Sequence, residues 1–392
     1  MPKLRRRIFL SERTKKIPES GVRAIFRLAR MRKDIIDLSI GEPDFPTPHH
    51  IIKAAVNAMK KGYTHYTPNA GLLEFREAVA EKLKRENKID ANPETEIIAT
   101  VGSMGAISLL MFVLIDQGDE ILIPCPGFAN YEAHVLMAGG KPIPYKLSEN
   151  GEFQPDLEEI SNLITGRTKG ILINTPSNPT GMVLGRDVLK GIVDLASEKN
   201  LTIISDEAYE KIIYEDAEHI SVASLPGAYE RTISIFSLSK TYAMTGWRIG
   251  YAVSTKEIIS QMTKLQEHLV AHPSSISQIA GAAALRGSQK CVKEMVKEYS
   301  ERREIIIKAL SKINRVRYIE PRGTFYVFPS ISELGVSSYK AALYLLEKAG
   351  VAVVPGIAFG KCGENHIRIS FSISKNILAK AIERLKNALE KY

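Results

Sequence analysis

A lysine between two hydroxyl residues stands in the stretch SLSKTYAMTGWRIGY, which spans residues 237–251 and follows the apolar run TISIF. Such a lysine is either a surface charge or a buried amine, and burial lowers the pKa of an amine and makes it nucleophilic. Ser237 and Arg248, on either side of Lys240, offer a hydroxyl and a guanidinium that suit a phosphate. These fifteen residues alone do not decide between surface charge and chemistry.

A carboxylate ends another apolar run, TIISD, and the sequence continues as SDEAY with Asp206 and Tyr209. A carboxylate in such apolar surroundings must be paired, or its pKa rises until it is neutral. Taken alone, Asp206 is better interpreted as the N-cap of a following helix than as a functional residue.

Two polar loops also follow apolar runs. NTPSNPTG, residues 174–181, contains Asn178 and is typical of a β-turn. GSMGA, residues 102–106, contains Ser103 and Met104 and can join a strand to a helix. A loop of this second kind can also bind a phosphate, because free N–H groups and the positive end of the helix dipole point to one place.

The elements that must position these residues alternate along the chain. Short apolar runs, several of them rich in isoleucine, predict strands covered on both faces, at 97–101, 120–123, 170–174, 202–205, 232–236 and 249–253. Segments of helix length lie between them, including 72–85, 106–115 and 186–199. This order predicts an α/β domain with a mostly parallel sheet, whose ligands bind outside the carboxyl ends of the strands.

The pattern changes beyond Gly287. Apolar residues at helical spacing predict one long amphipathic helix that contains Val292, Met295, Tyr299, Ile306, Leu310 and Ile313. Strands predicted at 325–328, 351–354 and 366–370 follow it and indicate a smaller α+β domain. We expect a basic N-terminal arm (1–33), a small domain (34–46 with 288–392) and a large domain (47–287).

The net charge of +9 is concentrated at the N-terminus. The first 33 residues hold 12 Lys or Arg against two Glu, so the other 359 residues carry 41 basic and 42 acidic side chains. We interpret the arm as a solvated segment or an oligomer contact and expect no nucleic-acid partner.

The remaining composition is that of an ordinary globular protein. The opening of the chain has only a three-residue apolar run after its arginines, too short for a signal-peptide core, and no apolar stretch elsewhere approaches the length of a membrane span. We therefore expect a cytoplasmic protein without membrane contact. The three cysteines, Cys125, Cys291 and Cys362, are widely separated, and their spacing suggests neither a disulfide framework nor a metal site.

Taken together, the motifs resemble the class I and II aminotransferases, pyridoxal 5'-phosphate (PLP) enzymes of fold type I. Residues 237–251 look like that family's S-x-S-K-x-x-x-x-x-G-x-R-x-G segment. The other motifs follow in the family's order over residues 35–372: DLSIGEPDFPTP, THYTPNAGLLEFREAV, GSMGA, PCPGFANY, NTPSNPTG, SDEAY, PRGTFYVF, VVPGIAFG and HIRIS. The resemblance implies a seven-stranded, mostly parallel sheet between helices in the large domain.

The resemblance also implies roles at the reacting centre. Lys240 would attach to the cofactor aldehyde and, once displaced by the amino-acid substrate, would move the proton from Cα. Asp206 would pair with the pyridine nitrogen and keep it protonated. Tyr209 and Asn178 would donate hydrogen bonds to the phenolic oxygen of the ring.

Further residues would hold the phosphate and the substrate. The backbone of Ser103 and Met104 would bind the phosphate together with Ser237 and Arg248, and the ring of Phe128 would stack on the cofactor. Tyr66 matches a tyrosine that reaches the phosphate of the neighbouring subunit, which implies a homodimer. Arg368 would bind the substrate α-carboxylate, assisted by the backbone near Gly41.

One position departs from the family's aspartate-specific subgroup. A lysine that recognises the distal carboxylate in that subgroup is replaced here by Met104, and a thioether cannot pair with a carboxylate. We therefore expect aromatic or other neutral L-amino acids as donors, with 2-oxoglutarate as the acceptor and a ping-pong mechanism. Aspartate transamination and a fold-type I C–S lyase are the alternatives. A DNA-binding regulator is disfavoured, because about 34 residues before the match are too few for a winged helix.

Overall fold

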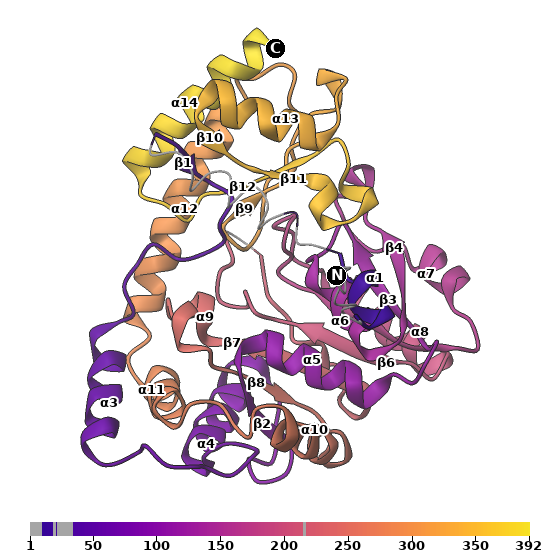
Figure 1. Ribbon diagram of the computed structural model, residues 1–392, viewed down its shortest axis with the longest axis vertical. Helices are drawn as coiled ribbons and strands as arrows, with labels where there is room; N and C mark the ends of the chain where they lie inside the picture. Colours follow the sequence, from indigo (N-terminus) through magenta and orange to yellow (C-terminus); the bar gives the residue numbers. More distant parts are fainter. Residues whose placement is uncertain (1–9, 19–20, 22–33, 215–216) are drawn as a thin grey trace, which may run out of the picture.

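The computed structural model describes residues 10–18, 21, 34–214 and 217–392. Most of the arm predicted over residues 1–33 lies outside the described residues, and α1 (Glu12–Lys16) belongs to its described part. The molecule has a broad lower part, built around the large sheet, and a narrower upper part that contains the C-terminus (Figure 1).

The lower part is built on a mixed seven-stranded sheet, so the chain has the expected α/β fold. Strand β8 is antiparallel to both of its neighbours, and the other neighbouring strands are parallel. The spatial order is β2 (Ile97–Thr100), β8 (Gly250–Val253), β7 (Thr232–Ser237), β6 (Thr202–Asp206), β5 (Thr168–Asn174), β3 (Glu120–Cys125) and β4 (Lys141–Lys146).

Helices cover both faces of this sheet because its strands are apolar on both sides. In β6, Ile203 packs in one buried cluster with α8, whereas Ile204 packs in another with α5. One face is covered by α5 (Gly102–Leu114), α6 (Asn130–Ala138) and α10 (Lys256–Leu269). The other face is covered by α3 (His49–Lys60), α4 (Leu73–Lys82), α7 (Leu157–Leu163), α8 (Arg186–Glu198) and α11 (Ser275–Arg286).

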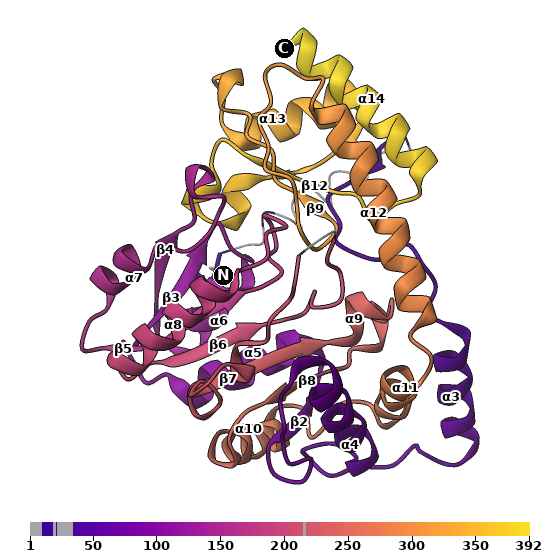
Figure 2. The ribbon, with the colours of Figure 1, turned by 180° about the vertical axis from the view of Figure 1, so that it is seen from behind.

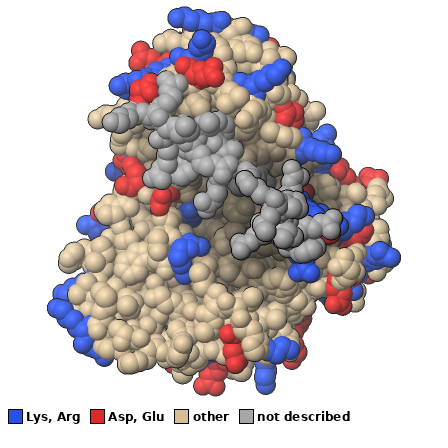
Figure 3. Space-filling view, in the orientation of Figure 1, with Lys and Arg blue, Asp and Glu red and all other residues tan. Residues whose placement is uncertain are grey.

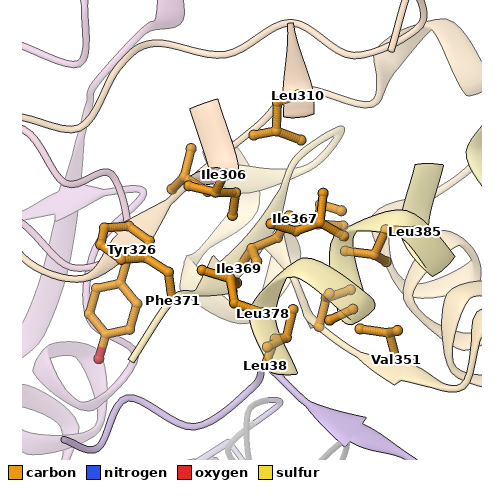
Figure 4. Packing of buried hydrophobic residues seen from close by; sticks show 14 of the residues in the cluster. Leu38, Ile306, Leu310, Tyr326, Val351, Ile367, Ile369, Phe371, Leu378 and Leu385 are labelled. Atoms are coloured by element: carbon orange, nitrogen blue, oxygen red, sulfur yellow. The ribbon is translucent and has the colours of Figure 1, made fainter. Parts of the chain in front are cut away.

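The upper part is an α+β arrangement reached through α12 (Lys290–Leu310), which runs upward from the lower part in both views (Figures 1 and 2). A three-stranded antiparallel sheet, β11 (Val354–Pro355), β12 (Ile367–Ser370) and β9 (Tyr326–Val327), packs with α12, α13 (Ser338–Tyr344) and α14 (Lys375–Lys391). Strand β1 (Ile36–Asp37) pairs with β10 (Val351–Ala352), and Leu38 enters the same buried cluster (Figure 4).

The structure confirms the predicted strands of the large sheet and corrects three expectations. The edge strand β4 was not predicted, because its two prolines and polar ends give no strand pattern. The single strand expected over 351–354 is divided into β10 and β11, which pair with different partners. The long helix ends at Leu310, so Ile313 is buried in the turn beyond it.

No helix within the described ranges combines the length and apolar character needed to cross a bilayer. The cytoplasmic location and the domain boundaries at 46/47 and 287/288 stay predictions.

Candidate active site

A cavity of about 280 Å³ lies where the loops after the large-sheet strands meet residues of the upper part. Every predicted site residue except Tyr66 lines it, although the residues come from separate stretches of the chain. They are Gly41, Ser103, Met104, Phe128, Asn178, Asp206, Tyr209, Ser237, Lys240, Arg248 and Arg368. The face in Figure 3 shows a hollow between the upper and lower parts, beside the residues drawn in grey.

Lys240 presents its amine to the cavity from the four-residue helix α9 (Leu238–Thr241). Ser237 caps this helix, since its hydroxyl accepts a hydrogen bond from the backbone of Ser239. The Lys240 Nζ donates to the carbonyl oxygen of Gly41 at 2.7 Å. Burial lowers the pKa of Lys240 to about 8; Glu42 opposes this shift, and the nearby charges of Arg368 and Arg248 contribute to it. Near pH 7, part of the Lys240 side chain is therefore in the neutral, nucleophilic form.

Asp206 ends β6 with its carboxylate almost fully buried, at 4% exposure. It accepts hydrogen bonds from the hydroxyl of Tyr131 at 2.8 Å and from the backbone of Ala208 at 3.1 Å. Burial raises its pKa to about 6, although both hydrogen bonds oppose the shift. A turn, rather than the helix expected from an N-cap, follows Asp206. Within the described chain no cationic side chain forms an ion pair with it, so the site suits a ligand N–H⁺ group.

The loop after β2 and Arg248 form a second polar surface of the cavity. Helix α5 begins at Gly102, and Val101 provides no side-chain cap, so the N–H groups of Ser103 and Met104 remain available. Gly102 has φ +66°, and a Cβ there would come within 2.7 Å of the Arg248 guanidinium. A helix N-terminus, an arginine and the nearby Ser237 make an anion site.

Arg368 is a buried cation without an acidic partner among the described residues. Its guanidinium donates to Asn178 Oδ1 at 3.0 Å and to the carbonyl oxygen of Ser39 at 2.5 Å, while its Nε has no hydrogen-bond partner there. It lies 4.3 Å from the ring centroid of Tyr326 and 5.0 Å from that of Phe359. A buried cation in this state favours a carboxylate ligand.

Asn178 is itself oriented by these contacts. Its backbone N–H donates to Asn174 Oδ1 at 2.8 Å, and the Asn174 amide donates to the Asp206 carbonyl at 3.0 Å. Because Asn178 Oδ1 accepts from Arg368, its amide nitrogen is directed elsewhere and can donate to a ligand.

Two tyrosines of the cavity were given no role from the sequence. Tyr131 holds Asp206, and the hydroxyl of Tyr326 lies 2.9 Å from that of Tyr209. Tyr326 stands at the edge of the upper buried cluster with its hydroxyl directed away from it (Figure 4). Both residues belong to motifs on which the family resemblance rests, PCPGFANY and PRGTFYVF. Their place in these motifs was the signal in the sequence that could have identified them as site residues.

Of the two aromatic residues predicted to contact the cofactor ring or its phosphate, one lines the cavity and the other does not. Phe128 lines it and contacts Tyr131 edge to face at 5.5 Å. Tyr66 does not line it: its side chain is 91% exposed and its ring meets that of His272 at 5.7 Å.

A buried polar network supports the turn that carries Asp206 and Tyr209. Glu207 accepts hydrogen bonds from Ser205 and Ser221 and is bonded to His219. Glu210 pairs with Lys82 of α4, and the Asn87 amide joins Glu210 to Ser221. The turn is thereby attached to α4 through groups that solvent does not reach.

The residues of the cavity fit pyridoxal phosphate. The helix N-terminus with Arg248 suits its phosphate, the unpaired carboxylate of Asp206 suits its pyridine N–H, and Lys240 offers an amine of lowered pKa to its aldehyde.

Comparisons with known proteins agree with this arrangement. Residues 33–385 match the family described as aminotransferase class I and II. A Pyrococcus horikoshii protein named aspartate aminotransferase is 45% identical over 388 residues, with 98% of each chain covered. Aromatic-amino-acid aminotransferase 2 of Thermococcus litoralis is 42% identical, with 97% of this chain and 98% of the relative covered.

A solved structure points the same way. The crystal structure of an aromatic aminotransferase from P. horikoshii matches with a TM-score of 0.90 at 44% identity, and the match covers 94% of this chain and 99% of the other. The agreement extends over nearly the whole length of each protein, so the chain belongs to the class I and II aminotransferases.

Proposed function

We propose that this aminotransferase uses pyridoxal phosphate to move the amino group of a neutral or aromatic L-amino acid to 2-oxoglutarate. The observation that carries the proposal is a single cavity with the Lys240 amine, the unpaired Asp206 carboxylate and the unpaired Arg368 guanidinium. In a ping-pong reaction the donor leaves as a 2-oxo acid before 2-oxoglutarate enters and leaves as glutamate.

Three groups of residues would hold the cofactor. The N–H groups of Ser103 and Met104, the hydroxyl of Ser237 and the fork of Arg248 would bind the phosphate. Phe128 would lie against the ring, and Asp206 would hold the proton of the pyridine nitrogen. Burial raises the pKa of Tyr209 well above its usual value, so its hydroxyl would remain protonated and donate to the phenolic oxygen beside Asn178.

Bound pyridoxal phosphate supplies an aldehyde that takes up the amino group and a ring that accepts the electron pair of Cα. Lys240 supplies the base: its neutral amine would take the proton from Cα and return it to the neighbouring carbon of the cofactor. A pKa of about 8 suits both steps, because the amine gains and loses a proton readily near neutral pH.

Arg368 would orient the substrate by its α-carboxylate. Its contacts with Asn178 and Ser39 fix the plane of the guanidinium before substrate arrives, which lowers the entropy cost of binding. Lys240 donates to the carbonyl of Gly41, two residues after Ser39, so the base and Arg368 contact the same segment of the chain.

Met104 is the basis of the expected donor preference. It is half-buried in the cavity, and its sulfur lies 3.3 Å from the Asn130 amide. The cations among the described lining residues are Lys240, Arg248 and Arg368, and the roles above use all three. An aspartate side chain would therefore lack a cationic partner.

Aspartate transamination is the second candidate. It is favoured by the printed name of the P. horikoshii relative, while the T. litoralis relative at similar identity is named for aromatic amino acids. The names of relatives therefore support both substrate classes.

Steady-state kinetics with 2-oxoglutarate as acceptor distinguish these candidates. We expect kcat/KM for tyrosine or phenylalanine to exceed that for aspartate by at least about tenfold, the ratio that corresponds to 1.4 kcal/mol of transition-state binding. In Met104→Lys the ratio should shift toward aspartate, whereas Met104→Leu, the matched control, should keep it. A wild-type preference for aspartate would overturn the proposed donor class.

We further propose a homodimer in which Tyr66 reaches the neighbouring cavity. Helix α3 buries Ile51, Ala55 and Ala58 on one side. On its other side, Ile52, Val56 and Met59 are 39%, 37% and 48% exposed. In the lower part of the face in Figure 3, the surface over α11 shows few charged side chains, while Lys and Arg line the left edge where α3 lies. An exposed apolar stripe beside an exposed tyrosine suits a contact between two copies of the chain.

A further inference from the structure

Two cysteines far apart in the sequence meet where the upper part contacts the large sheet. Cys125 ends β3, and Cys362 lies 237 positions later in the short helix η9 (Lys361–Gly363). The backbone N–H of Cys362 donates to the Cys125 sulfur at 3.1 Å, and the two thiols share a side-chain hydrogen bond. In both ribbon views the gold segment after β11 lies beside the strands β3 and β4 (Figures 1 and 2).

Backbone contacts keep the two segments together. Gly127 donates a hydrogen bond to the carbonyl oxygen of Phe359 at 2.9 Å. Gly360 has φ +103°, and a Cβ at this position would come within 2.9 Å of the Cys125 sulfur. Only a glycine allows so close an approach, so the pairing of the thiols follows from the fold of the turn.

The two thiols differ in exposure and in proton affinity. The hydrogen bond from Cys125 lowers the pKa of Cys362 to about 7, against the effect of burial and with help from the charge of Lys146. The same hydrogen bond and burial raise the pKa of Cys125. Glu132, facing Cys125, and Glu159, facing Cys362, act in the opposite sense to Lys146. A partly exposed thiolate thus lies against a buried thiol, which suits attack followed by resolution.

We propose that Cys125 and Cys362 form a redox modification site, which low-molecular-weight disulfides convert into an intramolecular disulfide. The Cys362 thiolate attacks one sulfur of the small disulfide, so a mixed disulfide forms and one small thiolate leaves. Cys125 then loses its proton and attacks the Cys362 sulfur, and the second small thiolate leaves. The cysteines together lose two electrons and the protons of their thiols, and the small disulfide is reduced to two thiols.

The bond would join the two parts of the molecule next to the active cavity. Cys125 stands three residues before Phe128, and Cys362 three residues after Phe359, whose ring packs on Arg368. Because the bond closes a very long loop, it should raise the midpoint of thermal unfolding by about 5 °C.

Alkylation and peptide mapping of the full-length holoenzyme test the proposal without relying on aminotransferase activity. The protein is incubated in glutathione buffers from fully reduced to fully oxidised, free thiols are alkylated, and non-reduced digests are analysed by mass spectrometry. We expect a cross-linked peptide of Cys125 and Cys362 in oxidising buffer, with the rise in thermal midpoint, and reversal by excess reduced glutathione.

Single substitutions assign the two steps. Cys125→Ser should accumulate glutathione on Cys362. In Cys362→Ser, Cys125 should remain a free thiol, which is alkylated once the protein is unfolded after the incubation. Cys291→Ser, the control at the third cysteine, should form the cross-link as the wild type does. The proposal is overturned if both thiols are alkylated in the most oxidising buffer, if glutathione stays on wild-type Cys362, or if the cysteines pair only with other partners.

Discussion

Asp206 has few stabilising contacts for a buried carboxylate, and this lowers the free energy of unfolding of the cofactor-free protein. Its pKa rises from 3.8 to about 6, chiefly through burial. Because the folded-state pKa lies above the unfolded value, the folded chain holds the proton more tightly. Stability should therefore fall as the pH rises from about 4 to 6 and remain lower at higher pH.

Asp206→Asn should for this reason stabilise the cofactor-free protein at pH 8 by about 3 kcal/mol, since one pKa unit corresponds to 1.36 kcal/mol. The gain should vanish near pH 4, where Asp206 is protonated, and urea unfolding at the two pH values measures it. The same variant should bind pyridoxal phosphate more weakly. A gain of equal size at both pH values would contradict the assigned cause.

The residues expected to contact the cofactor and the substrate could largely be predicted from the sequence, but the residues that support them could not. Lys240, Asp206 and Arg368 belong to motifs whose order carries the resemblance, and all three line the cavity. Tyr131 and Tyr326 act through contacts made by the folded chain, one on Asp206 and one on Tyr209. Sequence spacing alone does not reveal such contacts.

At the scale of elements, α4 and the turn after β6 depend on one buried ion pair. Lys82 is 2% exposed and Glu210 is 8% exposed, and Asn87 completes their hydrogen bonding. Removing one partner leaves an uncompensated buried charge, so Glu210→Ala should destabilise the protein by about 3–5 kcal/mol in urea unfolding. The double change Lys82→Met with Glu210→Leu should cost less, because neither charge remains.

Glu81 on the same helix provides the matched control. It pairs with Arg286 at the surface, where Glu81 is 51% exposed, and Glu81→Ala should cost at most about 1 kcal/mol. If Glu210→Ala were as mild as Glu81→Ala, the buried pair would not support the turn.

Whether a strand could be predicted depends on how many of its faces are buried. Strands such as β5 and β6 are apolar on both faces, and their pattern was sufficient to predict them. The edge strand β4 is mostly solvent-facing and contains two prolines, so only its pairing with β3 defines it. The break between β10 and β11 likewise depends on two different partner strands.

At the scale of the whole molecule, the one predicted site residue outside the cavity is Tyr66. Its exposure leaves it available to a second copy of the chain, so a hybrid dimer should distinguish a contribution in trans from one in cis. Lys240→Ala and Tyr66→Ala proteins are prepared separately and mixed under conditions that exchange subunits. If Tyr66 acts in trans, each hybrid dimer contains one intact site.

The mixture should then regain about a quarter of wild-type activity, because half of the dimers are hybrids with one intact site in two. The control contains equal amounts of the same two variants, but the step that exchanges subunits is omitted. Activity that stays at the sum of the two variants after verified exchange would mean that Tyr66 serves its own chain or neither site.

The central claim is that Lys240 binds the cofactor, and chemical mapping tests it most directly. Borohydride reduction of the holoenzyme fixes the cofactor to its amine, and mass spectrometry of the digest locates the modified residue. We predict a pyridoxyl group on Lys240, lost in Lys240→Ala and kept in the double variant Lys82→Met with Glu210→Leu, which removes the other buried lysine named above together with its charged partner. A modified lysine elsewhere, or a holoenzyme with no reducible attachment, would contradict the account.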